Sequence, residues 1–187
     1  MQHDPERGAE LIREVVGDQE VELLFLLPGV DANRYPYQEE AEYIQSLLEN
    51  IEGTHIKVSI QQMDWGPCKE EMEAGNYNLC LKIQGLHYAN PFSLFKGFMY
   101  TEGGTNISYG LGYHNDHVSD LIEEAAAFFN DTATTEIYTE LQEISAVDFP
   151  NIPVLYSQEV VASSSDITGY QATVYGLTGF TQVCWAE

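Results

Sequence analysis

The segment VELLFLLP (residues 21–28) most constrains the fold, because it is an apolar run with no polar face. Such a strand has to be covered on both faces, which is typical of the inner strands of a parallel sheet. Two further strands are predicted downstream. HIKVSIQQ (55–62) alternates apolar and polar residues, and YNLCLKI (77–83) follows as the third strand.

Helices are predicted before and between these strands, over residues 4–16, 35–53 and 66–76. The first has Asp4 as its N-cap. Its apolar residues share one face: Leu11, Ile12, Val15 and Val16. The second has apolar residues every three or four positions: Ala41, Ile44, Leu48 and Ile51.

The order strand-helix-strand-helix-strand over residues 21–90 predicts an α/β fold, with a parallel-rich sheet flanked by helices and right-handed crossovers. In open sheets of this kind, ligands bind beyond the carboxyl ends of the strands. Three segments follow the predicted strands: PGVDAN (28–33), QMDWG (62–66) and QGLHYANP (84–91). We expect these segments to meet at one edge of the sheet.

The chain changes character after residue 90. Helices are predicted over 91–100, 115–127 and 136–149, and a Gly-rich loop is predicted over 101–115. Asn115 or Asp116 is expected to cap the middle helix. The inward residues of the last helix are predicted to be Ile137, Leu141, Ile144 and either Val147 or Phe149. Beyond residue 150, one or two strands are predicted in IPVLYSQEVVASS (152–164), and another near the C-terminus.

The charge of the chain excludes several classes of partner. There are 7 Lys and Arg against 30 Asp and Glu, and the formal net charge is -23. Nucleic acids and anionic membrane surfaces require a basic surface, so neither is an expected partner. The acidic residues are spread along the chain, which favours a solvated surface. No run reaches the roughly 18 apolar residues that a membrane span needs.

The three cysteines (Cys68, Cys80 and Cys184) have no metal-binding spacing. A disulfide framework and a structural zinc site are therefore not expected, and the cysteines are interpreted as small apolar packing residues. The N-terminal residues have no basic region followed by an apolar run, so they are not interpreted as a signal peptide. Such a chain is either an ordinary cytosolic protein or a piece of something longer.

The predicted sheet edge contains the best ligand candidates. His87, Tyr88 and Asn90 can stack and form hydrogen bonds, although such a cluster can also serve only the backbone of a loop. Trp65 can stack on a ligand or pack, and packing or a cleft wall is favoured. Asp31 and Asn33 follow the first predicted strand and, like Asp64 after the second, are either cleft residues or helix caps.

Other polar residues have structural explanations beside functional ones. Asp64 is either a cleft acid or, as we favour, a helix cap. His114 and His117 form an H-x-x-H pattern that could bind a metal, but no third ligand is in register, and we interpret them as exposed. Tyr109 and Tyr113, with Asn106, form an aromatic loop that either faces a cleft or lies on the surface: the second is favoured.

Three ordered segments together resemble the family 5 solute-binding proteins of ABC importers. The first is EEAEYIQSLLENIEGTHIKVSIQQMDWGPCKEEMEAGNYNLCL (39–81), and its matching residues are Ile56, Lys57, Val58, Trp65, Ala74, Gly75, Tyr77 and Asn78. The second is GYHNDHVSDLIEEA (112–125), with Gly112, Tyr113, Asn115, Val118, Leu121 and Ile122. The third is IYTELQEISAVDFPNIPVLYSQEVVA (137–162), with Leu141, Gln142, Ile144, Pro150, Ile152, Pro153 and Val160.

This resemblance implies a lobe of a type II periplasmic-binding-protein-like fold. Residues 1–187 would be one incomplete solute-binding lobe, comprising the 21–90 core, a helical part at 91–150 and strands at 151–187 that return to a missing first lobe. The implied partners are the membrane subunits of an ABC importer. The full-length protein would be extracytoplasmic, in the periplasm or as a cell-surface lipoprotein, although this chain has no leader.

The implied function is the binding and delivery of peptides or a similar small solute, with no cofactor and no chemistry. In the peptide-binding members an Asp that holds the ligand amino group follows the third strand, and His87 takes that place here. A histidine lacks the fixed negative charge, which favours a nickel or metal-chelate receptor as an alternative. Two further alternatives to a solute receptor are a small α/β enzyme with a strand-end acid (Asp31 or Asp64) and a truncated product without activity.

One segment, NDTATTEIY (130–138), is unusual because its threonines lower helix propensity in a helix-forming region. It back-translates to AAT GAT ACG GCG ACC ACC GAG ATC TAC, which is a common flow-cell adapter of short-read sequencing in frame. We hypothesise that the adapter was assembled into the gene, with Phe128 and Phe129 as further candidates. The alternative is a natural helix start with Asp131 as its cap.

If the hypothesis is correct, genomic DNA that is independently amplified across codons 128–139 will lack this run. Direct sequencing of the amplified product checks it. An intact run in that product would show that the segment is natural.

Overall fold

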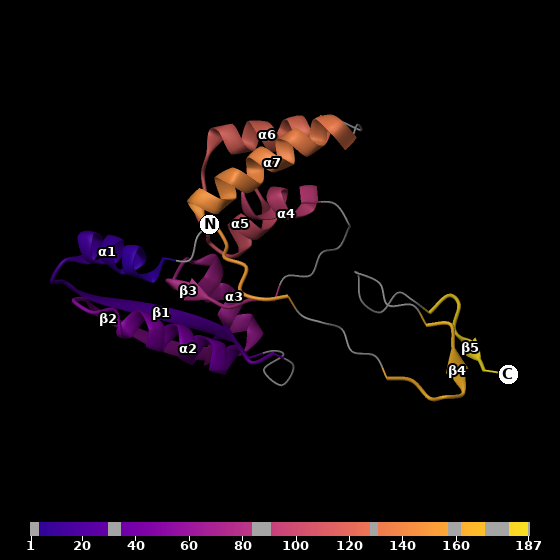
Figure 1. Ribbon diagram of the computed structural model, residues 1–187, viewed down its shortest axis with the longest axis horizontal. Coiled ribbons are helices and arrows are strands. Elements are labelled where there is room, and N and C mark those ends of the chain that lie inside the picture. Colours follow the sequence, from indigo (N-terminus) through magenta and orange to yellow (C-terminus); the bar gives the residue numbers. More distant parts are fainter. Residues whose placement is uncertain are drawn as a thin grey trace. The chain divides into compact units, whose positions relative to one another are not determined.

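A computed structural model describes residues 4–29, 35–83, 91–127, 131–156, 162–170 and 180–186 (Figure 1). The chain divides into two compact units. Unit 1 comprises residues 1–83 together with 105–112, and unit 2 comprises residues 84–104 together with 113–187.

The sheet of unit 1 has the predicted parallel arrangement. Its strands are β1 (Glu20–Pro28), β2 (His55–Met63) and β3 (Leu79–Cys80), in the order β2-β1-β3. Both β2 and β3 pair with β1 in parallel. As the apolar sequence of 21–28 predicted, β1 is the central strand, and its Phe25, Leu26 and Leu27 are almost fully buried.

Helices cover the sheet through two separate apolar clusters. Helices α1 (Pro5–Val16) and α2 (Tyr37–Glu49) contribute to the cluster around Phe25 and Leu27. Helix α3 (Trp65–Glu73) contributes Cys68 and Met72 to the cluster around Leu26. Because successive side chains of a strand point to opposite faces, these two clusters lie on opposite sides of β1.

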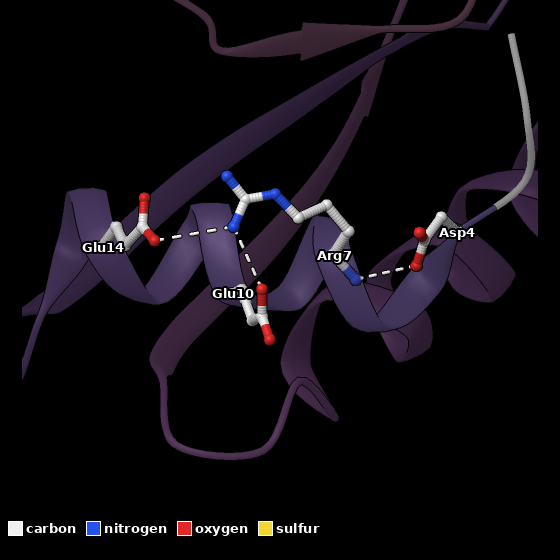
Figure 2. A network of polar contacts seen from close by, with 4 residues as sticks. All are labelled: Asp4, Arg7, Glu10 and Glu14. Carbon is white, nitrogen blue, oxygen red and sulfur yellow. Dashed lines mark hydrogen bonds and ion pairs between the residues drawn. The ribbon is translucent and has the colours of Figure 1, made fainter.

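The N-cap of α1 forms as predicted. The Asp4 carboxylate accepts a hydrogen bond of 2.9 Å from the Arg7 backbone N–H (Figure 2). The Arg7 guanidinium lies 3.0 Å from Glu10 and 3.6 Å from Glu14, all three exposed, so these ion pairs contribute little to stability. The predicted apolar face of this helix is only partly covered, because its Leu11 and Val15 are exposed.

Two elements differ from their sequence-based predictions. The third strand was predicted over 77–83, but only Leu79–Cys80 pairs regularly. Asn78 contacts Leu24 of β1 through both its backbone and its side chain: its backbone N–H donates to the Leu24 carbonyl over 3.0 Å, and its side-chain oxygen accepts a 2.8 Å hydrogen bond from the Leu24 backbone N–H. The predicted Gly-rich loop contains a short helix, α5 (Gly104–Ser108), that propensity did not indicate.

Unit 2 contains helices α4 (Pro91–Phe98), α6 (Asp116–Ala127) and α7 (Asp131–Asp148) and a hairpin of β4 (Ile167–Thr168) with β5 (Cys184–Trp185). The helices share a buried apolar set: Phe95, Phe98, Met99, Val118, Leu121, Ile122, Ala125, Ile137 and Leu141. Of the two candidate caps for α6, it is the Asn115 side-chain oxygen that accepts the Val118 backbone N–H, at 3.3 Å.

Several predictions for the C-terminal half were wrong. Val147 and Phe149 were candidates for the inward face of α7, but both are exposed, because they lie beyond the part of the helix that packs. Residues 152–156 form no strand, and the remainder of that predicted segment up to 161 lies outside the described residues. Cys184 is exposed on β5, so it is not a packing residue.

Residues 131–138 of the Thr-rich run form the first turns of α7. Across the described part of the chain, no helix combines the length and apolar character needed to cross a bilayer.

Gly110 is a sensitive position of unit 1. Its φ is +57°, and a Cβ at this position would overlap the Met72 carbonyl oxygen and lie 3.1 Å from the Gly75 nitrogen. Gly112 has a similar φ of +66° but has open space around it, which makes it a matched control.

We expect Gly110→Ala to lower the free energy of unfolding by about 3 kcal/mol, because backbone strain and overlap add together. Gly112→Ala introduces the backbone strain without the overlap, and it should lower the free energy of unfolding by about 1 kcal/mol. Urea denaturation followed by circular dichroism measures both values. Equal costs for the two substitutions would contradict the close approach of Gly110 to α3.

Candidate ligand-binding site

The carboxyl edge of the sheet in unit 1 is the candidate site. Because the strands are parallel, their carboxyl ends at Pro28, Met63 and Cys80 lie at the same edge. The backbone N–H of Gly29 donates to the Met63 carbonyl over 2.7 Å, which joins the segments that leave β1 and β2.

The predicted site residues divide between described and other parts of the chain. His87, Tyr88 and Asn90 fall within 84–90, which is outside the described residues. Asp31 and Asn33 fall within 30–34, which is also outside them. Trp65 and Asp64 are described, and both follow the end of β2 as predicted.

Trp65 begins α3 and connects the core to the edge of the sheet. Its half-buried side chain packs against the cluster of Leu26, Cys68 and Met72. The Lys82 ammonium lies 3.6 Å from the centroid of the Trp65 ring, in a cation–π contact. The packing role that was favoured for Trp65 therefore agrees with its position, and its role in ligand binding stays a prediction.

Lys82 is the residue of this edge that sequence reasoning missed. It lies two residues beyond β3, where a parallel sheet exposes its ligand-binding edge. A useful signal was available, because a lysine after the third strand and a tryptophan after the second are expected to converge. The Lys82 side chain is exposed, and its ammonium lies on the Trp65 ring. This edge therefore presents a positive charge beside an apolar surface.

Asp64 was interpreted as a helix cap, and the structure contradicts the side-chain part of this prediction. The residue occupies the N-cap position of α3, but its exposed carboxylate accepts no capping hydrogen bond. The Asp64 carbonyl instead accepts the Cys68 backbone N–H at 2.9 Å. The helix start is thus formed by the backbone.

Tyr37 fixes the segment that follows β3. Its hydroxyl accepts a 3.1 Å hydrogen bond from the Ile83 backbone N–H. The Tyr35 and Tyr37 rings lie 5.8 Å apart between centroids, so two aromatic side chains lie together at the start of α2. Residue 83 directly precedes the predicted ligand segment, and this hydrogen bond holds the backbone of Ile83 against α2.

Tyr77 and Cys80 are close to the site but remain uncharged at neutral pH. The Tyr77 hydroxyl donates a 2.5 Å hydrogen bond to the Tyr109 carbonyl, and burial above all raises the pKa of Tyr77 to about 12. Burial also raises the pKa of Cys80 to about 12, against the opposing effect of the Lys82 ammonium. Since the thiolate is the nucleophilic form, Cys80 is not an activated nucleophile.

Two residues of the predicted aromatic loop, Asn106 and Tyr109, are wholly or partly buried. Asn106 is only 4% exposed, and Tyr109 is half-buried, so the surface-loop interpretation was wrong for both. Tyr113 donates a 2.6 Å hydrogen bond to Asp148 within unit 2. Burial and this carboxylate raise the pKa of Tyr113.

The two histidines of the H-x-x-H pattern are exposed, as expected, and have different partners. His114 lies 3.4 Å from Asp116, whereas His117 lies 2.7 Å from Glu140. Within the described ranges, no three or more His, Cys, Asp and Glu side chains gather where they could hold a metal ion.

An open hollow of unit 1 lies at the opposite end of the strands. The starts of β1 and β2 contribute to its lining, which is Asp18, Glu20, Thr54, His55, Ile56 and Lys57. Lys57 and Glu20 pair with each other there, and the position lies away from the carboxyl edge. This hollow is therefore not the candidate site.

No protein-family model matches this chain, and no curated protein matches its sequence. Solved structures do match. The DppA protein of Helicobacter pylori, in complex with the peptide STSA, has a TM-score of 0.79 at 22% identity over 100% of this chain. A dipeptide binding protein of a Pseudoalteromonas species, in complex with Met-Leu, has a TM-score of 0.79 at 17% identity over 98% of it.

A third match is NikA of Brucella suis in complex with Fe(III)-EDTA, with a TM-score of 0.59 at 16% identity over 76% of this chain. These similarities confirm the predicted fold, that of part of a type II periplasmic binding protein. This chain spans only 35%, 36% and 30% of the length of the three proteins.

The contact between Lys82 and Trp65 is open to test. We expect Lys82→Met to lower the free energy of unfolding of unit 1 by about 0.5–1 kcal/mol, because the cation–π contact is lost. Trp65 fluorescence during urea unfolding, in a Trp185→Phe background, measures the change. Lys96→Met is the control, since that ammonium lies 5.5 Å from the Phe92 centroid in unit 2. Equal shifts for both variants would contradict the contact.

Proposed function

We propose that this chain is the ligand-binding part of an extracytoplasmic solute receptor that delivers peptides or a similar small solute to an ABC importer. The observation that carries the proposal is the similarity of nearly the whole chain to two structures of binding proteins in complex with peptides. Since one fold serves many functions, the proposal also depends on the chemistry of the sheet edge.

That edge offers contacts suited to a small polar ligand. The face of Trp65 gives an apolar surface for stacking, and the Lys82 ammonium gives a positive charge for a carboxylate of the ligand. We propose that His87, Tyr88 and Asn90 complete the site from the segment that follows β3. The mechanism is capture, closure and transfer to the importer, with no bond made or broken.

The receptor is proposed to be a longer protein with a first lobe. This chain spans about a third of the proteins it matches. A group of large apolar side chains is exposed near its C-terminal part: Val147, Phe149, Ile152, Val154, Leu155 and Tyr156. We propose that the first lobe covers these side chains and forms the second wall of the cleft.

A metal chelate is the second ligand that an observation favours. The structure of NikA with Fe(III)-EDTA is among the matches. At the position where peptide-binding relatives are expected to have an Asp, this chain has His87. An anionic chelate would suit the Lys82 ammonium and would require no fixed negative charge at residue 87.

A small α/β enzyme is less well supported. The Asp64 carboxylate is exposed at the end of β2, and Cys80 is protonated at neutral pH. Catalysis by an acid or nucleophile requires a partner that holds or activates it. At this edge the Asp64 carboxylate makes no capping hydrogen bond, and burial raises the pKa of Cys80, so neither is presented as an activated group.

If residue 87 faces the ligand, His87→Asp should strengthen binding of the dipeptide Met-Leu by about tenfold, because a carboxylate pairs with its free amino group. One wall of a cleft buries little ligand, so the starting dissociation constant should be in the millimolar range. Titration followed by the NMR signal of the Trp65 indole N–H measures both variants.

N-acetyl-Met-Leu is the matched control, since it lacks the amino charge and should not respond to the substitution. Fe(III)-EDTA, the second probe, tests the chelate alternative. Equal effects on both peptides would contradict the role of residue 87. Trp65→Ala removes the indole reporter, so its binding is followed through the NMR signals of the dipeptide instead. This substitution should weaken binding of Met-Leu, and unchanged binding would contradict the position of the site.

A further inference from the structure

Three sulfur atoms converge on the α3 side of the sheet in unit 1. Met72 Sδ lies 3.9 Å from Cys68 Sγ and also 3.9 Å from Cys80 Sγ. Cys68 and Met72 are almost fully buried, whereas Cys80 is partly exposed. All three cysteines of the chain are free thiols, so neither of these two is committed to a disulfide.

The separation of the sulfur atoms is suited to a shared metal ion. Two sulfur ligands at about 2.3 Å from one ion lie about 3.8–4.0 Å apart in tetrahedral or trigonal geometry. Both Met72–thiol distances of 3.9 Å fall in this range. An ion among the three sulfur atoms would therefore leave these two distances nearly unchanged.

We propose that Cys68, Met72 and Cys80 bind one soft monovalent metal ion of the Cu(I) class. Thiolates and thioethers are the ligands that select Cu(I). The surroundings are apolar and aromatic, with Leu26, Trp65 and Tyr77 in the same cluster. Such a shell limits the access of water to the ion, although the Leu81 carbonyl oxygen lies 3.5 Å from Cys80 Sγ.

The charges balance in this arrangement. Binding of one M⁺ displaces the two thiol protons to solvent and leaves a bis-thiolate complex with a net charge of -1. Burial raises the pKa of both thiols, and the Lys82 ammonium, which lies on the Trp65 ring, opposes that shift, so its positive charge partly offsets the charge of the complex. A divalent ion of the zinc class is less suited, because a thioether is a weak ligand for it.

Competition for Cu(I) with bicinchoninate, under anaerobic conditions, tests the proposal. The full chain with Cys184→Ser is used, which removes the exposed thiol. One Cu(I) per chain is expected. Met72→Leu should weaken binding about tenfold and Cys80→Ser about a hundredfold or more, because ligands are lost. Met63→Leu is the matched control, since Met63 packs against the same cluster but is not one of the three proposed ligands, and it should change nothing.

The proposal is wrong if Met72→Leu and Met63→Leu change the affinity equally. It is also wrong if Cys184→Ser abolishes binding, or if a folded Cys80→Ser chain, checked by circular dichroism, binds as before. Should Cys80→Ser fail to fold, X-ray absorption of the Cu(I)-loaded Cys184→Ser chain decides. Three sulfur neighbours at about 2.3 Å support the site, and a shell of two sulfurs or of nitrogen and oxygen overturns it.

Discussion

The burial of β1 on both of its faces is the constraint on which unit 1 depends. Phe25 and Leu27 pack on one side and Leu26 on the other, and each side is covered by different helices. Burial of each large apolar side chain contributes roughly 1.5–3 kcal/mol. Because β2 and β3 both pair with this strand in parallel, it also determines the edge at which their polar connections meet.

Trp65 joins that core to the candidate site. One side of its ring packs on the cluster around Leu26, and the Lys82 ammonium lies on the ring. The sulfur cluster belongs to the same packing layer, so Lys82 is close to both the proposed ligand edge and the proposed ion. Occupancy of one site would therefore change the electrostatic field at the other.

Fold and function are supported to different degrees. Similarity at 16–22% identity, over most or all of this chain, is carried by the backbone arrangement and shows the fold. The identity of the ligand depends on side chains. Three of the side chains that we propose to bind it, His87, Tyr88 and Asn90, follow β3, and their role stays a prediction. The net charge of -23 adds a constraint, because it favours a positively charged or neutral partner surface over nucleic acid.

The sequence by itself determined the alternation of strands and helices, the cap at Asp4 and the sheet edge at which the strands end together, whereas it left the cap of α6 open between Asn115 and Asp116. These depend on local spacing and on hydrogen bonds between residues a few positions apart. Only the tertiary structure decided that Lys82 lies on Trp65 and that the sulfur atoms of Met72 and Cys80 meet. Such contacts join separate elements through packing, and no local period records which side chains will converge.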